Sequence, residues 1–101
     1  MAEVEFSNAA EADLVEIDEF SVAHFGDDVA GIYMHGFDAA FIRLRDNPLA
    51  APLRSDFGEG IRCLVHRQHR ILYVVEGKRV LVVRIIHHVM DAARALRLAE
   101  E

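Results

Sequence analysis

The sequence predicts an α+β domain in which a helical hairpin packs on one face of a small, mainly antiparallel sheet. Three observations predict it. A short alternating segment opens the chain, two segments with helical spacing follow, and three runs rich in Val, Ile, Leu and Tyr lie between residues 61 and 86. Branched and aromatic side chains of this kind are typical of strands in a largely buried sheet. The expected order is β-α-α-β-β-β-α, in a single domain over residues 1–101.

The opening strand is predicted over Glu3–Phe6, where acidic and apolar residues alternate. Ser7 or Asn8 can cap the helix that follows, which is predicted over residues 9–25 and ends at Gly26. Its predicted buried positions are Ala10, Leu14, Ile17, Phe20 or Ser21, and Phe25. Its predicted acidic outer face consists of Glu11, Asp13, Glu16, Asp18 and Glu19.

The second helix is predicted over Val29–Arg45, because Pro48 cannot continue a helix. Its apolar stripe consists of Ala30, Tyr33, Phe37, Phe41 and Leu44. Two helices joined by so short a link form an antiparallel hairpin. Residues 49–59 contain proline and glycine and little periodicity, so they are expected to form a loop.

The three later strands are predicted over Ile61–Arg67, His69–Val75 and Arg79–Ile86. Glu76–Gly77 is the predicted two-residue turn between the last two, because glycine tolerates a positive φ. A tail helix is predicted over Asp91–Ala99. The opening strand can join the sheet by pairing in parallel with the final strand, which needs no crossing connection.

The charge is divided unevenly along the chain, whose net charge is −6. Residues 1–59 carry 3 basic and 13 acidic side chains, whereas residues 60–101 carry 8 basic and 4 acidic ones. The strands are therefore the electropositive part of an acidic protein. This favours a localised acidic partner over general binding of nucleic acid, which requires a basic domain. The alternative is that exposed arginines simply keep a small sheet soluble.

Composition excludes several other classes of protein. A single cysteine, Cys63, excludes an intramolecular disulfide and is typical of a reducing cytoplasm. No apolar run approaches the ~20 residues that span a membrane, and the N-terminus lacks the features of a signal peptide. We expect no metal and no cofactor, because the sequence contains no zinc-ligand spacing, phosphate loop or nucleotide fingerprint.

Several residues follow one another in a characteristic order along the strands: Gly60 and Arg62, then His69, Arg70, Ile71 and Tyr73, then Val83, Arg84, Ile85, Ile86 and His87, and finally Asp91. This ordered set resembles the RelE/ParE toxin superfamily, and the ParE branch most of all. The resemblance implies the toxin of a bacterial type II toxin–antitoxin pair. Its partner would be a ParD-like antitoxin that binds through a C-terminal tail, and operator DNA would be contacted only through that antitoxin.

The two branches differ in target, since ParE-branch toxins act on DNA gyrase and RelE-branch toxins cut mRNA on the ribosome. RNA cleavage without a metal needs a base, an acid and cations. Arg70 resembles the arginine of the ribonuclease branch, and His87 or His88 could serve as the acid. However, the loop over residues 49–59 has one basic residue and two acids, and the acidic protein would have to approach dense phosphate.

The sequence therefore favours a toxin that inhibits gyrase by binding, without hydrolytic chemistry of its own. The alternatives are a ribosome-dependent mRNA endoribonuclease and a non-toxic member retained for antitoxin binding. The predicted partner-binding residues are Arg62, His69, Arg70, Arg84 and His87. Arginine suits paired contacts with carboxylates, such as those of an antitoxin tail.

Strand register decides whether these residues share a face. A two-residue turn at Glu76–Gly77 would place Arg70 opposite Val83, with Arg70 and Arg84 on opposite faces. A three-residue turn would place Arg70 directly opposite Arg84. His69 and Tyr73 have matching parity on their strand, and we expect them to form a buried, hydrogen-bonded pair.

Overall fold

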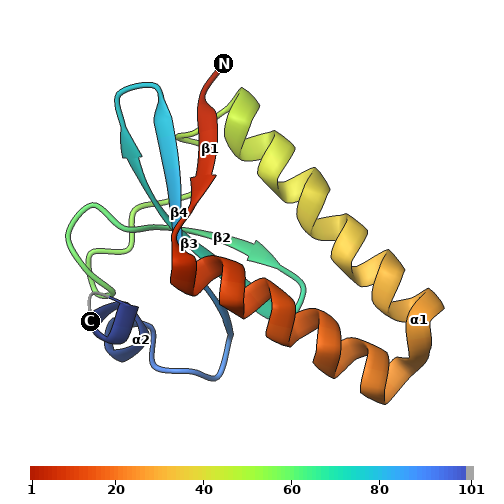
Figure 1. Ribbon diagram of the computed structural model, residues 1–101. Coiled ribbons are helices and arrows are strands. Elements are labelled where there is room, and N and C mark those ends of the chain that lie inside the picture. The colour runs from red at the N-terminus through yellow and green to blue at the C-terminus, as the bar shows by residue number, and fades with distance from the viewer. Residues whose placement is uncertain (100–101) are drawn as a thin grey trace.

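The computed structural model describes residues 1–99 and contains a four-stranded mixed sheet with a helix on each face (Figure 1). The strands are β1 (Glu3–Phe6), β2 (Arg62–His66), β3 (His69–Glu76) and β4 (Arg79–His87), in the spatial order β1-β4-β3-β2. The α+β class and the order of elements are confirmed. β1 pairs in parallel with β4, as predicted, and the other two pairings are antiparallel.

Helix α1 (Asn8–Asp46) is a hairpin of two arms, because Gly26 has non-helical backbone angles (φ 83°, ψ 170°). Glycine adopts such a positive φ without steric cost. The first arm covers residues 8–25 and the second covers residues 27–46, and the two diverge as a V (Figure 1). Ser7 is the N-cap, since its Oγ accepts a hydrogen bond of 3.0 Å from the Ala10 N–H.

Two hydrophobic cores lie on the two faces of the sheet. The larger core joins both arms of α1 to alternate residues of the strands: Leu64, Ile71, Tyr73, Val80, Val82 and Ile85. The smaller core joins helix α2 (Ala92–Ala99) to residues of opposite parity: Ile61, Cys63, Leu72 and Ile86. The hairpin therefore occupies one face, as predicted. The tail helix docks on the other face through Ala92, Ala95 and Leu96.

The turns are tight, and one differs from its prediction. Glu76 pairs with Arg79, so the β3–β4 turn consists of Gly77 and Lys78 and not of Glu76 and Gly77. Gly77 supplies the positive φ, at 60°, from the first turn position. The β2–β3 turn is Arg67–Gln68, in which Arg67 itself has a φ of 52°.

The loop after α1 covers half of the outer edge of the sheet. The Arg54 N–H donates to the Ile61 carbonyl at 2.7 Å, and the Cys63 N–H donates to the Pro52 carbonyl at 3.2 Å. Beyond Cys63 the loop leaves β2, so the edge at Val65 is open. Among residues 1–99, no helix has the length and apolar composition needed to cross a bilayer.

Candidate partner-binding site

A β-bulge in β4 decides which predicted site residues share a face. The pairing shifts between Tyr73–Val82 and Leu72–Arg84, so Val83 is the extra residue. As a result, Arg70 lies opposite Ile86, and Arg70 and Arg84 point to the α2 face. Neither of the two registers considered above is right. The turn lies one residue later than predicted, and the bulge inserts one extra residue into β4.

The predicted residues therefore fall into two groups. His69 and His87 are directly opposite each other on the α1 face. Arg62 lies on the same face but opposite Tyr73, toward the other end of β3. There its Nη1 donates to the Ala51 carbonyl at 2.7 Å and fixes the loop. The structure brings the two histidines together and separates them from the arginines.

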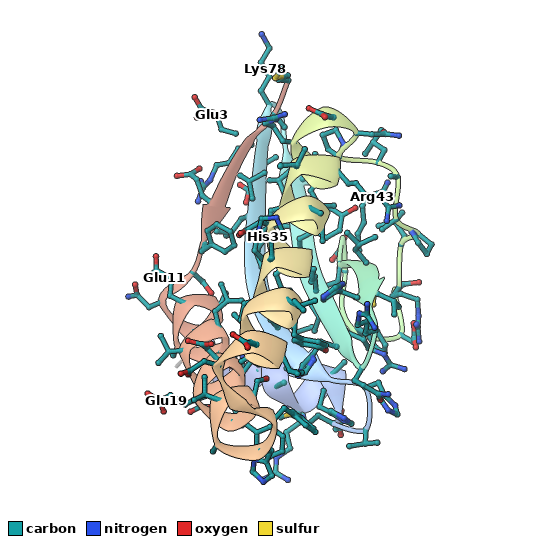
Figure 2. All side chains as sticks on the ribbon, turned by 90° about the vertical axis from the view of Figure 1, so that its right-hand side faces the viewer. Glu3, Glu11, Glu19, His35, Arg43 and Lys78 are labelled. Carbon is teal, nitrogen blue, oxygen red and sulfur yellow. The ribbon has the colours of Figure 1, made fainter. Side chains whose placement is uncertain are left out.

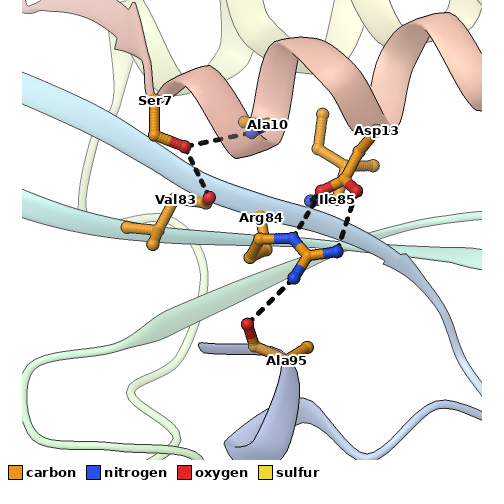
Figure 3. A network of polar contacts seen from close by, with 7 residues as sticks. All are labelled: Ser7, Ala10, Asp13, Val83, Arg84, Ile85 and Ala95. Atoms are coloured by element: carbon orange, nitrogen blue, oxygen red, sulfur yellow. Dashed lines mark hydrogen bonds and ion pairs between the residues drawn. The ribbon is translucent and has the colours of Figure 1, made fainter. Parts of the chain in front are cut away.

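Arg84 is tied to groups inside the molecule (Figure 3). Its Nε and Nη2 donate to the two carboxylate oxygens of Asp13 at 2.8 and 2.9 Å, and its Nη1 donates to the Ala95 carbonyl at 2.9 Å. The side chains of Arg84 and Asp13 are only 16% and 9% exposed. The hydrogen bond to Asp13 raises the pKa of Arg84 above its usual value. Arg84 thus joins α1, β4 and α2, and an internal carboxylate already occupies the place predicted for a partner.

The sequence prediction is wrong for Asp13, which it placed on the acidic outer face of the first arm. Its Oδ2 also accepts the Ile85 N–H at 2.9 Å, on the part of β4 that β1 does not reach. Glu11 and Glu19 do lie on the outer side of the arm (Figure 2). The signal for burial is the spacing of Asp13 from Ala10 and Ile17, which places it within the apolar stripe.

Arg70 is half-buried on the α2 face, with its guanidinium carbon 5.4 Å from the centre of the Phe57 ring. Arg54 lies over the same ring at 3.9 Å, but its guanidinium is held by Asp56 at 2.9 and 3.0 Å. Within residues 1–99, Arg70 forms no ion pair. Its cross-strand neighbour Val65 is 61% exposed on the open edge of β2. Of the three predicted arginines, Arg70 is therefore the one best placed to receive an external carboxylate.

Three histidines form a row across the sheet, because His66 faces His69 and His69 faces His87. Two aromatic residues of the second arm cover this row. The Phe37 ring centre is 4.5 Å from that of His66, and the Tyr33 hydroxyl is hydrogen-bonded to His69 Nδ1. The predicted His69–Tyr73 pair does not form, because the Tyr73 hydroxyl donates to the Pro48 carbonyl at 2.8 Å.

The second arm approaches the row closely at Gly36. A Cβ at that position would lie 2.5 Å from His66 Cε1, well inside van der Waals contact. Glycine is therefore required there for His66 to keep its position. His66 was not among the predicted site residues, since only the observed strand pairing places it beside His69.

The row opens into a hollow between the first arm of α1 and the ends of β3 and β4, which we call the histidine crevice. It has two adjoining parts of about 350 and 410 Å³ that share four residues: Phe20, Ser21, His69 and His87. The first part extends to Arg84 and Met90, and the second to Phe25 and Arg67. Of the predicted alternatives Phe20 and Ser21, Ser21 is the buried one and Phe20 is 58% exposed at the rim; Phe25 was predicted as buried but is 62% exposed.

The electrostatics of the crevice keep its central histidine neutral. Burial, and to a smaller extent the neighbouring His87, His66 and His88, lower the pKa of His69 to about 4, because a buried charge is poorly solvated and one positive charge disfavours another. Burial also raises the pKa of Tyr33. Near pH 7 His69 and Tyr33 are therefore neutral hydrogen-bonding groups within the crevice. Among residues 1–99, no group of three His, Cys, Asp or Glu side chains is arranged to hold a metal ion.

The fold is shared with several solved structures. The chain is similar to a chromosomal ParDE system from P. aeruginosa, with 22% identity, a TM-score of 0.75, and coverage of 86% of this chain and 96% of that chain. It is also similar to the RelBE2 complex from Mycobacterium tuberculosis, with 23% identity, a TM-score of 0.61, and coverage of 86% of this chain and 98% of that chain. The similarity to the DinJ–YafQ complex from E. coli has 18% identity, a TM-score of 0.54, and coverage of 87% of this chain and 94% of that chain. At these identities the likeness is one of fold.

A family model identifies the chain more closely than the structural likeness does. The model described as the ParE toxin of the type II toxin–antitoxin system, parDE, matches residues 4–92. No curated protein sequence matches the chain. The matched segment runs from β1 to the first residue of α2 and includes all four strands and both arms of α1. The chain belongs to the ParE toxin family of type II toxin–antitoxin systems.

Proposed function

We propose that this protein is a toxin that inhibits DNA gyrase in the cytoplasm by binding to it, and that a ParD-like antitoxin neutralises it. The observation that carries this proposal is the match to the ParE family model over residues 4–92. ParE-branch toxins act on gyrase, whereas the RelE branch cuts mRNA. The fold is common to both branches, so the choice between the targets depends on chemistry.

Three other side chains that could serve RNA cleavage, Arg84, Arg54 and His69, are engaged elsewhere or neutral. Cleavage at a 2′-hydroxyl needs a base, an acid and cations near the phosphate. Arg84 is paired with Asp13, and Arg54 is paired with Asp56. His69, with a pKa of about 4, is a weak base and carries no acidic proton at pH 7. This supports inhibition by binding.

The RelE-type ribonuclease remains the second candidate, because the RelBE2 complex shares the fold at a TM-score of 0.61. His87 and Arg70 are the residues that would carry such an activity. They point to opposite faces of the sheet, His87 beside α1 and Arg70 beside α2. A single phosphate cannot contact both across the sheet, which favours the gyrase proposal.

The open edge of β2 is suited to an antitoxin tail. Ile61 and Cys63 direct backbone groups outward to the loop, so by alternation Val65 directs its N–H and carbonyl outward as well. An extended chain can add to such an edge through main-chain hydrogen bonds. Arg70 and the exposed Val65 side chain lie beside each other there and would contact an acid and an apolar residue of the tail.

The function is tested by expressing the protein without its antitoxin. We expect growth arrest, and we expect the purified protein to inhibit gyrase supercoiling while mRNA stays intact in a ribosome assay. Growth arrest with active gyrase and cleaved mRNA would establish the ribonuclease instead. Normal growth with tight binding to the protein encoded by the adjacent reading frame would indicate a non-toxic member.

Arg70→Ala is expected to weaken antitoxin binding by about 2 kcal/mol, or roughly 30-fold in Kd, if Arg70 receives a carboxylate of the tail. Isothermal titration of the purified toxin with the antitoxin measures the effect. Arg45→Ala is the matched control, because Arg45 is exposed at the end of α1 and pairs only with its neighbour Asp46. An affinity unchanged by Arg70→Ala would place Arg70 outside the interface.

A further inference from the structure

We propose that the histidine crevice anchors one apolar side chain and one neighbouring carboxylate of the antitoxin tail, with the carboxylate accepting hydrogen bonds from the Nε2–H groups of His69 and His87. This inference rests on the proposed function, since it names how that partner is recognised. The crevice lies next to the open edge of β2, because Arg67, in the turn that follows β2, lines the crevice.

The proton positions of the two histidines follow from their partners. The Val89 N–H donates to His87 Nδ1 at 3.3 Å, and a backbone N–H can only donate, so neutral His87 carries its proton on Nε2. The Tyr33 hydroxyl is hydrogen-bonded to His69 Nδ1. Because a phenol O–H donates and the unprotonated nitrogen of a neutral imidazole accepts, we assign the hydroxyl proton to this bond, which leaves the His69 proton on Nε2.

Both imidazoles line the crevice, with their ring centres 5.5 Å apart and their planes at 86° to each other. Within residues 1–99, Nε2 of neither ring has a protein acceptor. In the proposed complex each Nε2–H donates to one oxygen of the carboxylate. A neutral amide of the same shape would present only one strong acceptor.

The rim supplies the apolar part of the site. Phe20, Phe25 and Val29 are each more than half exposed and line the part of the crevice nearest Arg67. Exposed large apolar side chains that cluster around a hollow are typical of an interaction surface. A volume of about 410 Å³ accommodates an aromatic side chain together with a carboxylate.

The charges around the crevice place the carboxylate at the end near Arg67. That part is lined by Arg67, His69 and His87, and no acidic residue among residues 1–99 lines it. The other part is lined by Glu16 and by Asp13, whose charge Arg84 balances. An anionic group is therefore favoured beside Arg67 and disfavoured beside Glu16.

Binding of a carboxylate should be coupled to proton uptake. The charged or titratable groups that face His69 are His66 from β2, His87 and His88 from the end of β4, Asp13 and Tyr33 from α1, and Arg67 from the turn. A negative charge beside His69 favours its protonated form and raises its pKa from about 4. The complex therefore binds more protons than the free toxin, and affinity should increase as the pH falls.

The proposal can be tested with 3-phenylpropionate as the probe and 3-phenylpropanamide as its neutral control, titrated into the full-length protein and followed by NMR. We expect the histidine signals of the crevice to shift with the carboxylate and to show a Kd near ~1 mM. The amide should bind at least about tenfold more weakly, because it lacks the charge that strengthens these hydrogen bonds. The carboxylate should bind more tightly at about pH 5.5 than at about pH 8, because the free pKa of His69 is about 4 and a bound carboxylate raises it.

Substitutions in the crevice provide the structural control. His69→Leu and His87→Leu should each weaken probe binding by about fivefold or more, and His69→Leu should also reduce the pH dependence of binding. His35→Leu should leave both unchanged within about twofold, because His35 is exposed on the outward side of the second arm (Figure 2). His87 lies at the rim, so the protein should fold without its imidazole.

Equal binding of acid and amide, an affinity that does not change with pH, or full binding by both crevice variants would overturn the proposal. The proposed function has a separate readout. If growth arrest and antitoxin binding persist while the probe result is negative, only the anchor site is wrong. If the protein neither arrests growth nor binds the antitoxin, the proposed function fails whatever the probe result.

Discussion

Replacing Asp13 with alanine is expected to lower the free energy of unfolding by about 3–5 kcal/mol, the range for breaking one partner of a buried ion pair. Both carboxylate oxygens accept from the Arg84 guanidinium, and one also accepts the buried Ile85 N–H. The substitution leaves a half-buried cation and a backbone donor without their acceptor. Urea denaturation followed by circular dichroism measures the loss.

Two further variants isolate the ion pair. Glu16→Ala, an exposed acid on the same arm, should change the free energy of unfolding by less than about 0.5 kcal/mol. The double variant Asp13→Leu with Arg84→Met removes both charges and should recover part of the lost stability, because a buried pair often contributes little over apolar packing, although the Ile85 N–H still lacks its acceptor. A loss below about 1 kcal/mol for Asp13→Ala would mean that the pair is not maintained in solution.

This geometry also explains why the internal pairing of Arg84 was not predicted, while its role in partner binding stays a prediction. The sequence shows that this strand contains an arginine. It does not show which residue pairs with that arginine, because the partner is 71 positions away on α1. The spacing of Asp13 from Ala10 and Ile17 indicates that Asp13 is buried. Only the direction of the arm along the free edge of β4 brings Asp13 to Arg84 and to the Ile85 N–H.

The elements themselves were predictable, because each depends on local physics. Branched residues marked the strands, Ser7 and Gly26 marked the start of the helical hairpin and the break between its arms, and the parallel pairing of β1 followed from a short connection. The candidate site was less predictable, because it depends on one extra residue. The bulge at Val83 puts Arg70 and Arg84 on the same face of the sheet. If the pairing continued from the observed turn without the bulge, the two arginines would lie on opposite faces.

The histidine crevice shows the same limit. His69 and His87 were predicted as site residues, and the register places them opposite each other. The prediction gave no role to Tyr33 beyond the apolar stripe, although its hydroxyl fixes the His69 ring. Phe20 and Phe25 have the spacing of buried residues, but the V-shaped divergence of the two arms leaves them at the rim. The angle between the two arms depends on the backbone at Gly26 and cannot be derived from the spacing of apolar residues.

Phe37→Ala is expected to lower the free energy of unfolding by about 3–5 kcal/mol, the usual cost of truncating a large buried aromatic residue. Phe37 is 1% exposed in the larger core, between the second arm and the sheet. Its ring centre lies 4.5 Å from that of His66 and 5.9 Å from that of His69. The cavity left by the ring would adjoin the histidine row directly.

The same substitution should therefore change the crevice as well as the stability. Water entering the cavity would reduce the burial of His69, and the pKa of His69 should rise from about 4 toward its ordinary value. NMR titration of the imidazole signals measures this shift, and urea denaturation measures the stability. Ile32→Ala is the matched control, since Ile32 is 71% exposed on the same arm and should leave both unchanged. A destabilised Phe37→Ala protein with an unaltered His69 titration would show that Phe37 supports the core but does not exclude water from the histidine row.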